Sequence, residues 1–149
     1  MPAISFPANC SCGLSSCSVQ SPNRVVVLSP SQRCRFVGIA VAGYQAYDVA
    51  GRVLPLDADL RGDLINRGLV RHHDVADADE HGIETQLPFI SRHFKGAQIL
   101  PLVIAHTTPQ AVAALIDHIV SKVQEKLLFV LSSDLSHFQN QDMAQKLDA

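Results

Sequence analysis

The sequence lacks the features by which nucleic-acid-binding and membrane proteins are usually recognised. It contains no Trp, two Tyr and six Phe, and its twelve Lys and Arg residues face fourteen Asp and Glu residues, for a net charge of −2. A nucleic-acid-binding protein normally carries a basic patch and aromatic stacking platforms, so this class is disfavoured. No apolar stretch approaches the length of about 20 residues that spans a bilayer. We therefore expect a soluble protein with neither nucleic acid nor membrane as a partner.

The amino-terminal segment has no feature of an export signal. Residues 1–9 contain no Lys or Arg and no apolar stretch, so we expect a cytoplasmic protein with reduced thiols. Cys10, Cys12 and Cys17 lie in a Ser-rich segment that lacks the repeated C-x₂-C spacing of a zinc ribbon. Because this segment has no core-forming periodicity, we expect an irregular leader over residues 1–22 and one domain over residues 23–149. The sequence assigns no role to these three cysteines or to Cys34.

Apolar runs and helical periodicity predict an α/β domain. The chain has 149 residues, 47% of them hydrophobic, and can bury one core. The expected strands are residues 25–28 and 127–131, both buried, residues 36–41 and 98–105, and residues 51–56 at a sheet edge because of Pro55. The expected helices begin at Asp57 or Asp59, at Glu80, and at Thr108, the second ending before Pro88 or kinking there. Apolar side chains between residues 112 and 123, including Val120, recur on one helical face. The strand–helix–strand order indicates a central, mostly parallel sheet with flanking helices.

Three polar clusters follow or adjoin the apolar strands. They are residues 29–33 after the first strand, residues 80–84, and Asp134 with His137 after the last strand. In an open parallel sheet, ligands bind beyond the carboxyl ends of the strands. We therefore expect a pocket there that includes Ser31 and Gln32.

Two of these clusters contain both carboxylates and imidazoles. Asp134 and His137 are three residues apart, so the carboxylate can accept a hydrogen bond from one ring nitrogen and leave the other for acid–base chemistry. The alternative is that Asp134 caps a helical turn and His137 lies on the surface. Glu80, His81 and Glu84 form a compact group, with both glutamates on one helical face. The alternative there is that acidic residues simply favour a helix amino terminus.

Other signals of catalysis are weak. The sequence contains no G-x-S-x-G, G-x-G-x-x-G or Walker A motif, which disfavours a serine hydrolase and a nucleotide-binding protein. His72, His73 and His93 lie in polar stretches where we expect exposed side chains. His118 is expected at the solvent edge of its helix.

At these same clusters the sequence resembles the Memo family, whose bacterial and archaeal members are called AmmeMemoRadiSam system protein B. Residues 25–31, Val-Val-Val-Leu-Ser-Pro-Ser, are similar to the family's apolar strand followed by Gly-Pro-Ser-His. Residues 47–57 resemble its Tyr-x-Thr-Pro-Leu-Gly segment. The longest matches are residues 79–89, Asp-Glu-His-Gly-Ile-Glu-Thr-Gln-Leu-Pro-Phe, and residues 132–137, Ser-Ser-Asp-Leu-Ser-His. The order and spacing of all four segments fit the family from residue 23 onward.

The resemblance implies a fold and a chemistry. The family resembles class III extradiol dioxygenases, α/β enzymes that bind Fe(II) through two His and one carboxylate. His137 matches the family's pocket histidine, which resembles the acid–base catalyst of those enzymes, and Asp134 would orient it. Glu80 and His81 match the family's Glu-His motif.

The chain departs from the family at the implied metal site. Gln32 stands where the family's Gly-Pro-Ser-His motif has a histidine ligand, and Ser29 stands in place of the glycine. An amide is a poor substitute for imidazole on a transition metal. The family's earlier Pro-His-Ala-Gly-Tyr segment is not found before residue 25, and the family continues beyond the Ser-Ser-Asp-x-x-His motif. We therefore expect a partial Memo-like domain: a fragment, a mis-started or truncated reading frame, or a shortened member.

Three functions remain open on the sequence alone. The first is a Memo-like protein that keeps part of a dioxygenase-like pocket without an intact metal site, so that no cofactor is expected as the chain stands. The second is a dioxygenase-like oxidoreductase that uses His137 as acid–base catalyst, with Fe(II) or Cu if the site is completed. The third is a non-enzymatic protein that binds a peptide or small ligand. Uncovered sheet edges would favour self-association.

Overall fold

A five-stranded, mostly parallel sheet forms the centre of the computed structural model, which describes residues 21–78, 80–133 and 140–147. The strand order is β5-β2-β6-β1-β7. The strands are β1 (Arg24–Pro30), β2 (Ile39–Val41), β5 (Arg71–His72), β6 (Gln98–Ile104) and β7 (Leu127–Leu131). β1 runs parallel to both of its neighbours, whereas β2 is antiparallel to β6 and parallel to β5. A separate antiparallel hairpin consists of β3 (Ala46–Val49) and β4 (Arg52–Pro55).

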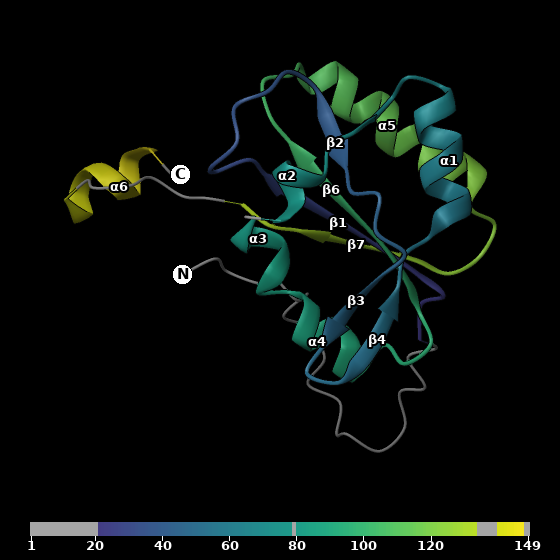
Figure 1. The fold of residues 1–149 in the computed structure, drawn as a ribbon. Helices are drawn as coiled ribbons and strands as arrows, with labels where there is room; N and C mark the ends of the chain where they lie inside the picture. The colour runs from purple at the N-terminus through teal and green to yellow at the C-terminus, as the bar shows by residue number, and fades with distance from the viewer. Residues whose placement is uncertain (1–20, 79, 134–139, 148–149) are drawn as a thin grey trace.

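Helices cover both faces of the central sheet. The helices of the described chain are α1 (Ala58–Asn66), α2 (Asp74–Ala78), α3 (His81–Glu84), α4 (Leu87–His93), α5 (Pro109–Lys122) and α6 (Gln141–Leu147), of which α6 lies apart from the sheet (Figure 1). In Figure 1, α1 and α5 lie together on one side of the sheet, and α3 and α4 lie with the β3–β4 hairpin on the other. This architecture confirms the predicted α/β class. None of the helices in the described part of the chain is long and apolar enough to cross a membrane.

Alternating side chains of β1 divide the core into two layers. Val25 and Val27 pack in a cluster with side chains from β4, α3 and α4, whereas Val26 and Leu28 pack in a cluster with α1 and α5. All four side chains are at most 4% exposed. Successive strand side chains point to opposite faces, and both faces are covered here, so a continuous apolar run is what this position requires.

The sequence signals for the two longest helices are confirmed. The Asp57 side chain precedes α1 and accepts a hydrogen bond from the Leu60 N–H at 3.0 Å. The helix ends just before Gly68, whose φ of +69° suits glycine. Thr108 precedes α5 and accepts a hydrogen bond from the Ala111 N–H at 3.2 Å. Both helices therefore begin where a side chain satisfies an amide that the helix leaves unpaired.

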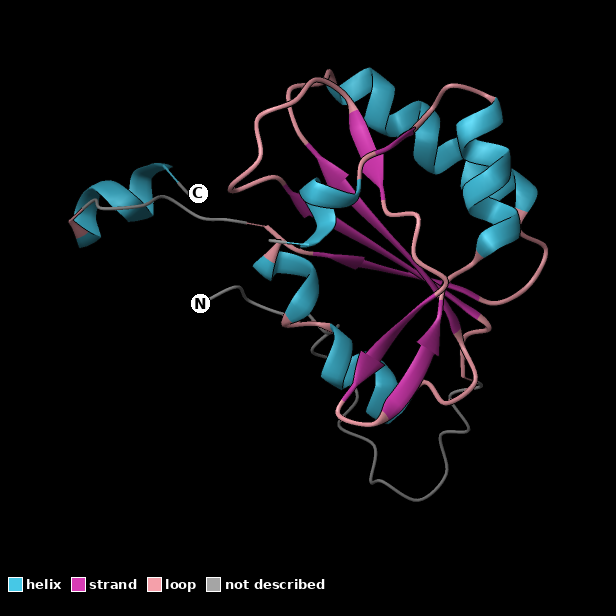
Figure 2. Ribbon diagram, in the orientation of Figure 1, coloured by secondary structure: helices cyan, strands magenta, loops and turns pink. Residues whose placement is uncertain are grey.

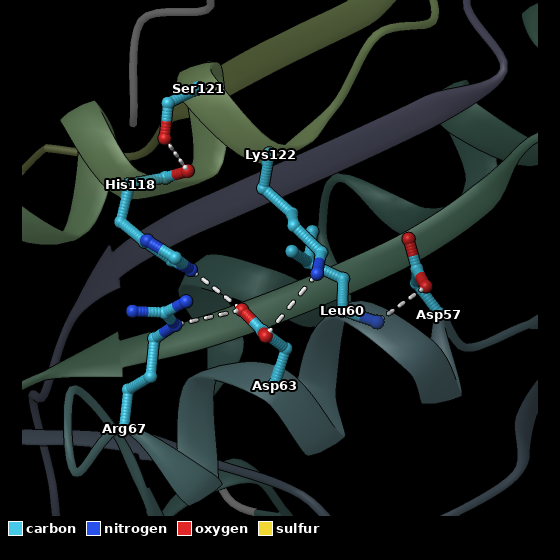
Figure 3. A network of polar contacts seen from close by, with 7 residues as sticks. All are labelled: Asp57, Leu60, Asp63, Arg67, His118, Ser121 and Lys122. Atoms are coloured by element: carbon cyan, nitrogen blue, oxygen red, sulfur yellow. Dashed lines mark hydrogen bonds and ion pairs between the residues drawn. The ribbon is translucent and has the colours of Figure 1, made fainter.

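A polar network joins α1 to α5 (Figure 3). The Asp63 carboxylate on α1 lies 2.6 Å from Nε2 of His118 and 3.4 Å from Nζ of Lys122, both on α5, and 3.5 Å from Nε of Arg67. The hydrogen bond with His118 is the main reason why the pKa of Asp63 is lowered from its ordinary value of 3.8; desolvation opposes this, and Lys122 and Arg67 add to it. The expectation for His118 is wrong, because its side chain is only 16% exposed and bridges two helices.

Several local expectations need correction. The strand at residues 127–131 is not buried: β7 lies at the sheet edge, and none of its side chains is fully buried. For the helix after Glu80, by contrast, the expected end before Pro88 is confirmed: it ends at Glu84, and α4 follows with Pro88 in its first turn, where a missing N–H is tolerated. Val120 is 55% exposed and does not belong to the buried face of α5. His73 is half-buried, with its ring centroid 5.3 Å from that of Phe36.

Candidate functional site

The carboxyl ends of β1, β6 and β7, at Pro30, Ile104 and Leu131, meet on one side of the sheet, which we call the carboxyl edge. Figure 2 shows their arrowheads pointing toward α2 and α3. Ser31 follows β1, and its N–H donates to the Ile104 carbonyl at 2.7 Å. Ser132 follows β7, and its N–H donates to the Leu28 carbonyl at 2.8 Å. The polar segments that follow these strands are therefore held together by backbone hydrogen bonds.

Glu80 connects the carboxyl edge to α3. Its side chain is almost fully buried, and Oε2 accepts a hydrogen bond from the backbone N–H of Gln32 at 3.0 Å. Oε1 accepts a hydrogen bond from the N–H of Gly82 at 3.2 Å, which makes Glu80 the amino-terminal cap of α3. The structure thus brings Ser31, Gln32 and Glu80 together. Both carboxylate oxygens of Glu80 bind backbone amides, so this side chain positions the loop after β1 against α3.

Gly82 allows α3 to approach the two strands closely. A Cβ atom built on Gly82 would lie 2.1 Å from Oγ of Ser29 and 3.0 Å from Oγ of Ser132. Ser29 is fully buried at the end of β1. Only glycine permits this contact without a shift of its neighbours.

His81 does not join Glu80. Its Nδ1 lies 3.3 Å from Oε2 of Glu84, and the two side chains are 53% and 77% exposed. The expectation that Glu80 and Glu84 share one helical face is wrong, because Glu80 precedes α3 in an extended conformation and turns its carboxylate into the protein. The Glu-His motif therefore separates into a buried cap and a solvent-exposed imidazole.

Asp134 and His137 lie outside the described residues. Their pairing, and the acid–base role that the resemblance implies for His137, stay predictions. The described chain leads to them through Ser132, whose contacts place it beside Leu28 and Gly82 at the carboxyl edge.

A hollow of about 640 Å³ opens at the carboxyl edge, between the loop after β1 and the segment after β6. It is lined by Ser31, Gln32, Arg33, Cys34, Arg35, Ile104, Ala105, His106 and Thr107. Sequence reasoning placed Ser31 and Gln32 in a pocket and included Arg33 in the polar cluster after the first strand, but it did not single out Arg35 or His106. Their signal was position alone, since they follow the carboxyl ends of two strands that prove to be parallel neighbours.

The donor side chains of the described residues do not assemble into a metal site. No group of three or more His, Cys, Asp or Glu side chains in this part of the chain is arranged to hold a metal ion. Cys34 is a half-buried free thiol in the wall of the hollow, and its carbonyl accepts a hydrogen bond from the Ser31 hydroxyl at 2.6 Å. Cys10, Cys12 and Cys17 lie outside the described residues.

The sequence matches a family model described as Memo-like protein over residues 10–149. This match confirms the resemblance that the polar motifs suggested. It begins inside the segment that we expected to be a leader, and the structure describes the chain only from residue 21, so the boundary at residue 22 stays a prediction.

Curated relatives carry the same family name. The chain is 29% identical over 133 residues to a MEMO1 family protein of Aquifex aeolicus, which covers 87% of this chain and 49% of that protein. It is 29% identical over 139 residues to one of Sulfolobus acidocaldarius, with 86% and 47% covered, and 37% identical over 89 residues to one of Methanobrevibacter smithii, with 54% and 32% covered. The chain spans about half the length, or less, of these relatives. With the α/β fold and the motifs at its carboxyl edge, the match over residues 10–149 shows that this chain belongs to the Memo-like protein family.

Proposed function

We propose that this chain binds a small organic molecule in the hollow at the carboxyl edge and does so without a resident transition metal. The hollow itself carries the proposal. Its volume of about 640 Å³ falls in the range usual for small-molecule sites, and it lies beyond the carboxyl ends of parallel strands, where such sites form in open sheets. Ligand binding is thus the function that this geometry supports best.

The residues near the hollow do not suit the iron or copper that the family resemblance implies. Gln32 offers an amide where the family has an imidazole, and both carboxylate oxygens of Glu80 already accept backbone N–H groups. His81 is directed toward Glu84 at the surface. A transition metal needs several convergent imidazole, thiolate or carboxylate donors, and the described residues supply none. The proposed function therefore contains no step at a metal.

One observation favours a second candidate function, a dioxygenase-like reaction with His137 as acid–base catalyst and Asp134 as its positioning residue. Ser132 Oγ would lie 3.0 Å from a Cβ on Gly82, so the chain leaves the carboxyl edge toward Asp134 close to Glu80. This candidate requires a metal bound by residues outside the described part.

Metal analysis of the purified full chain distinguishes the two candidates. We expect protein produced in iron- and copper-supplemented medium to contain much less than one equivalent of either metal by mass spectrometry, for the parent chain and for His137→Ala alike. One equivalent of iron or copper in the parent chain would overturn the metal-free proposal. Its loss in His137→Ala, with retention in the control His93→Ala on the exposed end of α4, would favour the dioxygenase-like candidate instead.

A further inference from the structure

The residues that line the hollow at the carboxyl edge carry positive charges and no negative charge. Two of its nine lining residues, Arg33 and Arg35, carry guanidinium groups that stay charged at all physiological pH values, and none of the nine is acidic. His106 adds an imidazole to the opposite wall. A chain with a net charge of −2 thus places two permanent cations around a hollow without a carboxylate in its lining.

These two guanidinium groups are not used to stabilise the fold. Other arginines have clear structural partners: Arg24 pairs with Asp57 and Arg67 with Asp63, while Arg61 donates to the carbonyls of Ala42 and Tyr44. Within residues 21–78, 80–133 and 140–147, neither Arg33 nor Arg35 has an ion pair or a side-chain hydrogen bond. Their donors are therefore available to a ligand.

Backbone contacts hold the walls in place without using those donors. On one wall, the Ser31 N–H donates to the Ile104 carbonyl at 2.7 Å and the Gln32 N–H donates to Glu80 at 3.0 Å. On the other wall, the His106 N–H donates to the Phe36 carbonyl in the loop before β2 at 3.2 Å. The His106 carbonyl in turn accepts a hydrogen bond from the Gly38 N–H at 2.9 Å. A site with fixed walls loses less entropy when it binds a ligand than a disordered loop does.

We propose that this hollow binds the phosphate group of a small phosphorylated molecule, with Arg33 and Arg35 as its ligands. The proposal rests on the small-molecule binding proposed above and names the chemical class of the ligand. A guanidinium presents paired N–H donors that match two oxygens of an anion. Two such groups carry a combined charge of +2, which a phosphate dianion with three terminal oxygens matches better than a carboxylate monoanion with two. The Thr107 hydroxyl supplies a further donor in the lining.

The test uses inorganic phosphate as the probe and the full chain as the protein. Phosphate and acetate are titrated separately at constant ionic strength, and binding is followed by NMR shifts of the backbone amides of Arg35 and Thr107. We expect saturable shifts with phosphate and much weaker binding of acetate. Arg33→Gln and Arg35→Gln should each weaken phosphate binding about tenfold, because each removes a charge-assisted contact. Arg92→Gln, at an exposed position of α4, is the matched control and should bind like the parent chain.

Three results would overturn the proposal: no saturable shift with phosphate, equal affinity for acetate and phosphate, or equal phosphate affinity in the double variant Arg33→Gln/Arg35→Gln and in Arg92→Gln. Both arginines are exposed, so the variants are expected to fold, and their urea midpoints check this. Metal analysis gives an independent result for the proposed function. A metal-free chain that fails to bind phosphate would refute the ligand class alone, whereas a chain with one equivalent of iron would refute the metal-free function.

Discussion

At Gly82 the backbone of α3 lies against the ends of β1 and β7 with no room for a side chain. The N–H of Gly82 binds Glu80 Oε1, and the missing Cβ leaves space for the hydroxyls of Ser29 and Ser132. The cap of α3 and the packing of α3 on the sheet thus depend on the same residue. Since Glu80 also holds the Gln32 N–H, a shift of α3 would be transmitted to the loop that lines the hollow.

Replacement of Gly82 by Ala is therefore expected to destabilise the protein. Overpacking of a tight contact usually lowers the free energy of unfolding by about 1–3 kcal/mol, and Ser29 has little freedom to move because it is fully buried. Gly62→Ala is the matched control: an added Cβ at this half-buried position of α1 meets no atom within 4 Å, and alanine in a helix gains about 0.5–1 kcal/mol over glycine. Urea unfolding followed by circular dichroism measures both variants. Equal midpoints for the two would contradict this account of Gly82.

Residue positions at the carboxyl edge could be predicted, but the contacts that define the site could not. Ser31 and Gln32 follow an apolar run, so their place beyond a strand end could be inferred from the sequence. The partner of Glu80 is a backbone amide 48 residues away, and a backbone partner leaves no residue-type pattern to recognise. Arg33 and Arg35 resemble any charged pair in a loop until β6 is known to lie beside β1.

At the scale of elements, the sequence predicts a helix or strand correctly where several local signals agree. It misses short strands whose existence depends on the strand with which they pair. Capping residues and periodicity both indicate α1 and α5, whereas β3 and β5 are short and exist through pairing with β4 and β2.

Pro101 lies within β6, although proline usually breaks a ladder. Ile99 and Pro101 are two residues apart in β6, so their backbone polar groups point to the same edge of the strand, the edge away from β1. On that side Ile99 accepts the Asp57 N–H, while β2 pairs only with Val103 and Ile104, so no strand needs the missing N–H of Pro101.

The contact between α1 and α5 gives a prediction of pH dependence. The pKa of Asp63 is lower in the folded protein than the ordinary value of 3.8, chiefly because of its hydrogen bond with His118. A carboxylate with a lowered pKa stabilises the folded state fully above the unfolded value, and this contribution is lost as the pH falls from 3.8 toward the folded pKa. Asp63→Asn should therefore be less stable than the parent chain near neutral pH, and the difference should shrink below pH 3.8.

The midpoints of urea unfolding, measured near neutral pH and below pH 3.8, test this prediction. Asp117→Asn, an exposed change on α5, the helix that carries His118, is the control and should leave the midpoint nearly unchanged at both pH values. A deficit of Asp63→Asn that is equally large at both pH values would show that the carboxylate acts through packing rather than through its charge.

At the scale of the whole molecule, the central sheet has two unequal edges. β5 has only two residues, whereas β7 has five, all of them apolar, and Leu131 is 64% exposed. In the described part of the chain β7 pairs with β1 alone, which leaves a row of backbone N–H and C=O groups along its outer side. An apolar edge strand without a charged residue is a template for pairing with a second chain.

We accordingly expect the full chain to self-associate through β7, with an elution volume in size-exclusion chromatography that decreases as the protein concentration rises. Leu131→Lys should shift the protein toward the monomer, because a lysine on an edge strand opposes pairing, and the exposed position allows the change without loss of the core. Val53→Lys on β4 replaces a side chain that is even more exposed, at 75%, and is expected to leave the association unchanged. A sharp monomer peak of the parent chain at every concentration, with cooperative thermal unfolding, would refute the role of β7. An equal effect of the two lysine variants would show that general surface charge, and not strand pairing, controls the association.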